Sequence, residues 1–179
     1  MKPILMVIAP INFRDEELFN TKIEIEKAGF KTVLASIKEG VCVGTNGGKA
    51  SAEIDIDQVI SSDHEAVIFI GGSGSRVYFS NKKSHQIAKE MYQQGKIVSA
   101  ICIAPVILGE AQLLNNKKVT VHDSEIDTIK KFGVIYTGET VTQDGQIITC
   151  SGPAYASLFG KAIAREIKRF AKIPILGSM

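Results

Sequence analysis

The sequence contains only three cysteines, and their spacing is not typical of a disulfide scaffold or a zinc site. Cys42, Cys102 and Cys150 lie far apart, no CxxC motif is present, and the three histidines form no HxxxH pair. An odd number of widely spaced thiols argues against a disulfide framework, and the lack of paired ligands argues against zinc. We therefore expect a cytoplasmic protein that keeps its thiols reduced and holds no metal.

The sequence also lacks a long hydrophobic run. Its main apolar stretches, residues 3–11 and 100–108, have about nine residues each, whereas a membrane-spanning helix needs about twenty. The first stretch leads into Asn12-Phe13-Arg14-Asp15 rather than into a small-residue cleavage site. We therefore expect neither a membrane span nor a signal peptide, and interpret this stretch as a buried first strand.

Charge of one sign is not concentrated anywhere along the chain. Twenty-one Lys and Arg residues and 19 Asp and Glu residues give a formal net charge of +2. The basic cluster at 161–172 has the spacing of the solvated face of a helix. This balance does not predict a nucleic-acid interface. The length of 179 residues and the 45% hydrophobic content predict one globular domain spanning residues 1–179.

Short apolar strands alternate with amphipathic helices along the chain. Residues 4–9 are typical of a strand buried on both faces, a helix follows at 15–28 and a second strand at 32–37. Further strands are expected at 66–70, 97–101, 119–121, 134–136, 139–142 and 147–150. Further helices are expected at 81–94, 104–114, 124–131 and 154–171. The segment 39–52 is expected to form an irregular excursion or a small hairpin. This alternation predicts an α/β fold, a flavodoxin-like doubly wound sandwich with a mostly parallel sheet and helices on both faces.

The strongest local signal for chemistry is Ala100-Ile101-Cys102-Ile103-Ala104-Pro105. In an open α/β sheet, ligands bind beyond the carboxyl ends of the strands, and here a strand turns sharply into a helix at such an end. The small residues two before and two after Cys102 permit the close approach that a nucleophile elbow requires. The start of the helix would favour the thiolate of Cys102. The alternative is a buried structural cysteine.

Gly71-Gly72 ends the neighbouring strand. Backbone amides there, together with that of Ile103, are suited to an oxyanion hole, although a plain turn would have the same sequence. Val77 interrupts a dinucleotide fingerprint, and no Gly-Lys-Ser/Thr follows, so no nucleotide cofactor is expected.

Two further side chains are candidates for proton transfer at the same edge of the sheet. Glu17 lies in the first turn after the first strand, where it either assists the thiol or complements a helix dipole at the surface. His122 ends a strand, where it either activates the thiol or is structural. His64 and His85 are expected at the surface, and Cys42 and Cys150 are expected to be structural.

The order of these motifs extends over nearly the whole chain. They are the strand at 4–9, Asp15-Glu16-Glu17-Leu18, Ile68-Phe69-Ile70-Gly71-Gly72, the elbow around Cys102, Val119-Thr120-Val121-His122, and residues 145–153. In this order they resemble the ThiJ/PfpI superfamily, which includes the Parkinson's disease-associated deglycase and has a class I glutamine-amidotransferase-like fold.

This resemblance implies a role for each candidate. Cys102 would be the nucleophile, with a thiol pKa below the ~8.5 of a free cysteine. Glu17 would hydrogen-bond its sulfur, His122 would be the nearby imidazole, and the amides of Gly72 and Ile103 would bind developing negative charge. The resemblance also implies a homodimer or higher homo-oligomer that needs no cofactor.

Two positions differ from the peptidase-like branch of this superfamily. Ile103 stands where that branch has histidine, and residues 73–77 read Ser-Gly-Ser-Arg-Val where it has an Arg-Ala-Pro-Glu run. We therefore expect a glyoxalase- or deglycase-like, stress-protective enzyme whose partner is a small α-oxoaldehyde or an early adduct on a glycated protein. The alternatives are an intracellular cysteine peptidase or amidase and, from another class, an oxidative-stress sensor or chaperone acting through oxidation of Cys102.

Overall fold

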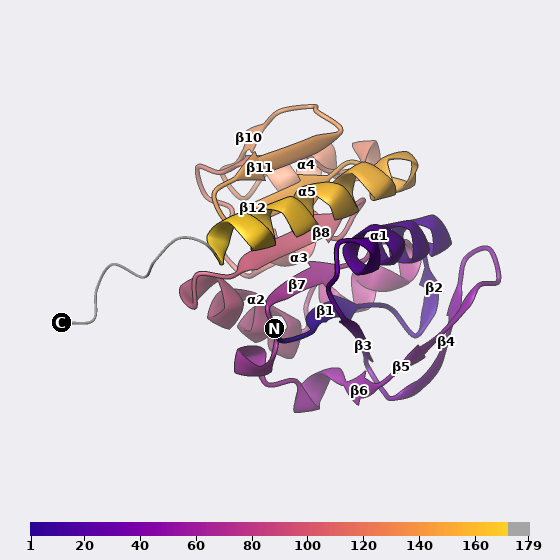
Figure 1. Cartoon of the computed structure of the whole chain (residues 1–179). Helices are drawn as coiled ribbons and strands as arrows, with labels where there is room; N and C mark the ends of the chain where they lie inside the picture. Colours follow the sequence, from indigo (N-terminus) through magenta and orange to yellow (C-terminus); the bar gives the residue numbers. More distant parts are fainter. Residues whose placement is uncertain (172–179) are drawn as a thin grey trace.

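The computed structural model describes residues 1–171, which form a central sheet between layers of helices (Figure 1). Within this range the main sheet has seven strands, in the order β11 (Val141–Asp144), β12 (Ile147–Cys150), β8 (Ile97–Ile101), β7 (Ala66–Phe69), β1 (Ile4–Val7), β3 (Thr32–Ser36) and β6 (Ile54–Asp55). All neighbouring strands in this sheet pair in parallel except β11, which is antiparallel to β12. The expected doubly wound, mostly parallel α/β fold is confirmed.

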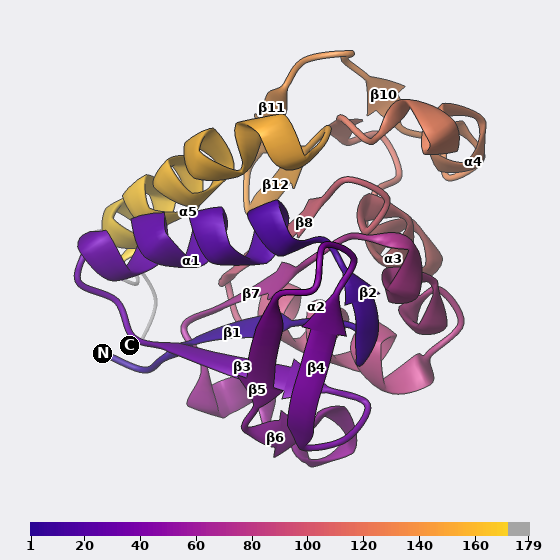
Figure 2. The ribbon, with the colours of Figure 1, turned by 90° about the vertical axis from the view of Figure 1, so that its right-hand side faces the viewer.

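Helices cover both faces of the sheet (Figure 2). On one face lie α1 (Asp15–Lys27) and α5 (Ala156–Phe170), and on the other lie α2 (Lys82–Gln93), α3 (Pro105–Glu110) and α4 (Ile126–Lys130). The surroundings of β1 on both faces explain why its sequence is continuously apolar. Ile4 and Met6 pack in the core beneath α1 and α5, whereas Leu5 and Val7 pack in the opposite core, and none is exposed.

Several elements differ in detail from the sequence-based expectation. The helix expected at 104–114 ends at Glu110, because Gln112 adopts a left-handed backbone with a φ of 61°. The helices expected at 124–131 and 154–171 begin with 3₁₀ turns, η4 (Asp123–Glu125) and η5 (Pro153–Tyr155). Two short strands, β9 (Lys118–Val119) and β10 (Ile135–Tyr136), pair with each other outside the main sheet. The remaining 3₁₀ turns are η1 (Ile56–Gln58), η2 (Ser61–Asp63) and η3 (Ser73–Tyr78).

The segment expected as an excursion or a small hairpin is a hairpin. Strands β4 (Gly40–Gly44) and β5 (Lys49–Ala52) are antiparallel, and β4 also pairs with β2 (Ile11–Phe13), which the sequence did not predict. These strands form a small sheet beside the main one (Figure 2). The hairpin thereby reaches the same edge as the first turn of α1.

Asp15 fastens this hairpin to α1. Its two carboxylate oxygens accept hydrogen bonds from the backbone amides of Asn46, at 2.8 Å, and Gly48, at 2.7 Å. Gly44 leaves room for the carboxylate, since a Cβ at this position would lie 2.4 Å from Oδ2 of Asp15. The carboxylate therefore helps to position Thr45, which lies in the turn of the hairpin and whose amide also donates to the carbonyl of Phe13 at 2.8 Å.

We expect Asp15→Ala to lower the free energy of unfolding by about 2 kcal/mol, because it leaves two backbone amides without their acceptor. Urea unfolding followed by circular dichroism measures this loss. Asp57→Ala is the matched control, since Asp57 is exposed and should change stability little. Equal stability of the two variants would contradict the anchoring role of Asp15.

None of the helices in residues 1–171 combines the length and apolar character needed to cross a bilayer.

Candidate active site

Cys102 occupies a strained corner between β8 and α3. Its φ of 64° lies in the left-handed region, which costs roughly 1–2 kcal/mol for a residue other than glycine. Two neighbours hold this conformation in place. The amide of Cys102 donates to the carbonyl of Cys150 at 2.8 Å, and its carbonyl accepts from the amide of His122 at 2.9 Å. The corner has the strained geometry expected for a nucleophile elbow.

Small residues surround this corner, as the sequence predicted. Ala100 and Ala104 are fully buried. Gly71 packs even more closely, because a Cβ at this position would lie 2.7 Å from Cβ of Cys102 and 2.6 Å from Oε2 of Glu17. The side chains of Cys102 and Glu17 therefore both lie against the backbone of Gly71, and a residue with a side chain at position 71 would collide with them.

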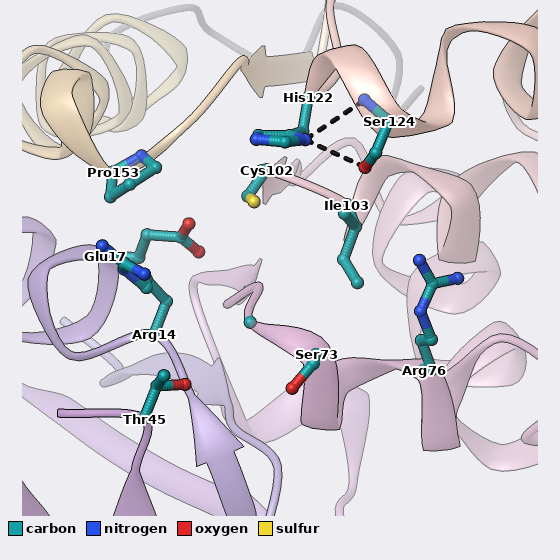
Figure 3. Close-up of a pocket in the computed structure, with 11 residues that line it drawn as sticks. Arg14, Glu17, Thr45, Ser73, Arg76, Cys102, Ile103, His122, Ser124 and Pro153 are labelled. Atoms are coloured by element: carbon teal, nitrogen blue, oxygen red, sulfur yellow. Dashed lines mark hydrogen bonds between the residues drawn. The ribbon is translucent and has the colours of Figure 1, made fainter. Parts of the chain in front are cut away.

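Glu17 is fully buried beside the thiol (Figure 3), so the interpretation of Glu17 as a surface acid is wrong. Oε2 accepts a hydrogen bond from the amide of Gly71 at 2.8 Å, whereas Oε1 has no hydrogen-bond partner in residues 1–171. Burial raises the pKa of this carboxyl from 4.5 to about 7, although its contacts with the Cys102 thiol and the Gly71 amide oppose the rise. Glu17 is therefore able to hold a proton near neutral pH.

The pKa of the Cys102 thiol is raised, whereas the sequence led us to expect a lowered value. Burial is the main cause, and the negative charge of Glu17 adds to it. The amides of Gly72 and Ile103 interact with the sulfur and act in the opposite direction. Helix α3 is only six residues long, so its dipole is a weak source of thiolate stabilisation. Because two negative charges are unfavourable here, Cys102 and Glu17 form a pair that retains one proton.

The thiol opens into a pocket of about 420 Å³ at the carboxyl edge of the sheet (Figure 3). The pocket is lined by Arg14, Glu17, Thr45, Gly72, Ser73, Arg76, Cys102, Ile103, His122, Ser124 and Pro153. All five candidate site residues, from four separate segments, thus line one cavity. Sequence reasoning did not single out the other lining residues as site residues, which are Arg14, Thr45, Ser73, Arg76, Ser124 and Pro153, although Arg14, Ser73 and Arg76 are close to Glu17 or Gly72 in the chain.

His122 reaches the pocket, but its side chain bonds to Ser124 rather than to the thiol. Nδ1 lies 2.9 Å from Oγ of Ser124 and accepts a hydrogen bond from the Ser124 amide at 3.2 Å (Figure 3). The link from His122 to Cys102 is the backbone hydrogen bond described above. With Nδ1 as the acceptor, the neutral ring carries its proton on Nε2.

The other histidines and thiols have structural surroundings. His64 is only 6% exposed, so its expected surface position is wrong, and burial lowers its pKa. His85 is half-buried, with Nε2 2.9 Å from the carbonyl of Phe79. Cys42 and Cys150 are buried free thiols, as expected. No group of three His, Cys, Asp or Glu side chains suited to a metal ion occurs within residues 1–171.

A comparison with protein families decides how this elbow, carboxyl and pocket are to be classified. The model of the DJ-1/PfpI family matches residues 2–166, almost all of the described chain. The chain belongs to the DJ-1/PfpI family. The resemblance inferred from the ordered motifs is therefore confirmed.

Similar proteins occur in archaea and bacteria. An uncharacterized protein of Methanocaldococcus jannaschii is 42% identical over 169 residues, covering 93% of this chain and 82% of the relative. A protein of Pyrococcus furiosus named Deglycase PfpI is 27% identical over 149 residues, covering 83% of this chain and 90% of the relative. The crystal structure of a ThiJ/PfpI domain protein from Brachyspira murdochii matches with a TM-score of 0.91 and 29% identity, covering 94% of this chain and 99% of that one.

Proposed function

We propose that this DJ-1/PfpI protein is an enzyme that uses Cys102, without a cofactor, to convert α-oxoaldehydes or their early protein adducts into hydroxy acids. The observation that carries the proposal is the pair formed by a thiol and a fully buried carboxyl, with a carboxyl pKa of about 7, at the base of an open pocket. One group supplies a nucleophile and the other a proton. The name of the Pyrococcus relative, a deglycase, is consistent with this carbonyl chemistry.

The first step is the attack of the Cys102 thiolate on the aldehyde carbon. A C–S bond forms, and the electron pair of the C=O bond moves to oxygen, which gives a hemithioacetal oxyanion. The amides of Gly72 and Ile103 already interact with the sulfur, so they are close to the position where this charge develops. Glu17 holds the proton that the thiol gives up.

The second step moves hydrogen between adjacent carbons. Glu17, after giving its proton to the oxyanion, takes the proton from the former aldehyde carbon, and the electron pair of that C–H bond forms an enediolate whose negative charge lies on the former ketone oxygen. Glu17 then returns the proton to the former ketone carbon, and the hydroxyl proton of the former aldehyde carbon moves to the former ketone oxygen as the C=O bond of the thioester forms. The result is a thioester of a 2-hydroxy acid. Water then cleaves the C–S bond and releases the hydroxy acid and the thiol. The net change is R–CO–CHO + H₂O → R–CHOH–COO⁻ + H⁺, in which the ketone is reduced as the aldehyde is oxidised.

An early adduct on a protein leads to the same hemithioacetal by a different first step. Its former aldehyde carbon carries a hydroxyl and the protein nitrogen. The thiolate forms the C–S bond as the C–N bond breaks, and the leaving amine takes a proton from Glu17. The guanidinium side chain of Arg76 at the pocket is 54% exposed, so the pocket mouth is open to solvent and to a surface side chain.

A second candidate function is the sensing of peroxide by Cys102. It is favoured by Oε1 of Glu17, which is buried beside the thiol and has no partner within the described residues. When protonated, this oxygen would donate a hydrogen bond to an oxidised sulfur. Two equivalents of hydrogen peroxide would convert the thiolate into a sulfinate and release two molecules of water. Peptide hydrolysis has weaker support, because Ile103 follows the nucleophile and the His122 ring bonds to Ser124.

The deciding experiment is an assay of methylglyoxal conversion by the purified protein without glutathione or added metal. We expect stoichiometric lactate, identified by mass spectrometry, with heat-denatured protein as the control. Absence of lactate would reject the proposal. The mass of the Cys102 peptide under graded peroxide and the cleavage of unstructured peptides then test the two other functions.

A further inference from the structure

Two arginines stand at the mouth of the pocket that contains Cys102. Arg14 precedes α1 and Arg76 lies in η3, and in Figure 3 their guanidinium groups lie on opposite sides of the opening. Among the described residues that line the pocket, the one carboxyl is that of Glu17, which is fully buried at its base. The rim of the pocket therefore offers two guanidinium groups, with the hydroxyl groups of Thr45 and Ser73 beside them.

Each arginine is held in place by a carboxylate outside the pocket lining. Nε of Arg14 donates to Glu16 at 2.8 Å, and Glu16 in turn accepts from Nδ2 of Asn46 at 3.0 Å. Nη2 of Arg76 donates to Glu125 at 2.5 Å, and Cζ of its guanidinium lies over the ring of Phe79, 5.4 Å from the ring centroid.

These contacts leave further N–H groups on each guanidinium. Nη1 of both Arg14 and Arg76 has no hydrogen-bond partner within residues 1–171. The side chains are 37% and 54% exposed, respectively, so a ligand in the pocket is able to reach them. A guanidinium that is already oriented loses little entropy when it binds an anion, and it matches carboxylate and phosphate oxygens in geometry.

We propose that the pocket selects α-oxoaldehydes whose far end carries a carboxylate or phosphate, which Arg14 and Arg76 bind while the aldehyde faces Cys102. This substrate class rests on the proposed function above. A pocket of about 420 Å³ accommodates a five-carbon acid between the rim and the thiol. A neutral aldehyde such as methylglyoxal is expected to react, but without hydrogen bonds from Arg14 and Arg76.

The first test measures charge selection without requiring turnover. Iodoacetate and iodoacetamide alkylate thiols and are similar in size, but only iodoacetate is negatively charged. We expect the ratio of the iodoacetate rate to the iodoacetamide rate at Cys102 to fall about 10-fold in Arg14→Gln, because the carboxylate of iodoacetate loses a charge-assisted hydrogen bond from the guanidinium. Arg76→Gln is made together with Glu125→Gln, so that no buried carboxylate is left unpaired, and the same fall is expected. Arg165→Gln on α5 is the control for net charge, since Arg165 is 69% exposed and outside the pocket.

The second test compares substrates of matched length. We expect kcat/KM for 4,5-dioxopentanoate to exceed that for 2-oxopentanal by about 10-fold in the wild type, and this ratio to disappear in the arginine variants. The phosphate ester of 3-hydroxy-2-oxopropanal, tested in parallel, distinguishes phosphate from carboxylate as the preferred group.

The two tests separate the failure of this inference from that of the proposed function. An alkylation ratio and a substrate preference that are the same in wild type, Arg14→Gln and Arg165→Gln would overturn the inference, even if both aldehydes were converted. Failure to convert any aldehyde would reject the proposed function and the substrate class with it. The alkylation ratio would still show whether the two arginines draw anions to the thiol.

Discussion

Cys102→Ser is expected to abolish lactate formation from methylglyoxal, lowering kcat/KM by at least ~10³-fold. The hydroxyl of serine is nearly as small as the thiol, so the corner between β8 and α3 should retain its shape. A hydroxyl does not ionise under conditions in which a thiolate forms, and Glu17, with a pKa of about 7, is too weak a base to deprotonate it. The loss would therefore come from the missing nucleophile rather than from misfolding.

Cys150→Ser is the matched control for this change. Cys150 is a buried free thiol on the neighbouring strand, and its Sγ lies 3.6 Å from the carbonyl of Gly152, a contact that a hydroxyl is able to replace. We expect this variant to convert methylglyoxal at a rate within about 3-fold of wild type, and both variants to have wild-type circular dichroism spectra. Turnover by Cys102→Ser at the wild-type rate would show that Cys102 is not the nucleophile.

The sequence predicted the frame of the site well because that frame depends on local rules. A continuous apolar run such as residues 4–7 must be buried on both faces, and small residues at 100 and 104 are needed where a strand turns tightly into a helix. The carboxyl edge of a parallel sheet then brings segments that are distant in the chain to one place. For this reason the five candidate site residues line a single pocket.

The properties that the sequence did not predict depend on packing between distant segments. Nothing near Glu17 in the chain indicates that it is fully buried, because the residues that cover it, Gly71 and Cys102, follow the ends of β7 and β8. The pKa of the thiol depends on that burial and on the charge of Glu17, and these outweigh the short helix α3. Similarly, Thr45 enters the site because β2 pairs with β4, the carbonyl of Phe13 accepts from the amide of Thr45, and Asp15 holds the β4–β5 hairpin against α1.

Glu17→Gln is expected to change catalysis and thiol reactivity in opposite directions. The amide keeps an acceptor for Gly71 but does not exchange protons, so kcat for methylglyoxal should fall about 10²–10⁴-fold. It also carries no negative charge, which removes one cause of the raised thiol pKa. Alkylation of Cys102 by iodoacetamide at pH 7 should therefore become faster. Lower alkylation together with lower turnover would instead indicate a collapsed site.

Stability provides an independent test of the buried carboxyl. Below pH 4.5 the carboxyl is protonated in both the folded and the unfolded chain. As the pH rises from 4.5 through the folded-state pKa of about 7, the unfolded chain ionises first, so the wild type loses stability over this window, by about 3 kcal/mol. Glu17→Gln lacks this loss. Its free energy of unfolding, measured in urea, should therefore exceed that of the wild type increasingly from pH 5 to pH 8.

Glu26→Gln is the control for this measurement, because Glu26 lies on the same helix with its side chain 44% exposed. Its stability should follow the wild type across the same pH range. If the difference in the free energy of unfolding between Glu17→Gln and the wild type were the same at pH 5 and at pH 8, Glu17 would ionise freely in the folded state. Glu17 would then have no proton to hold near neutral pH, and the proton transfers assigned to it between thiol, oxyanion and carbon would need another group. His122, the remaining titratable side chain of the lining besides the two arginines and the thiol, would be the next residue to test.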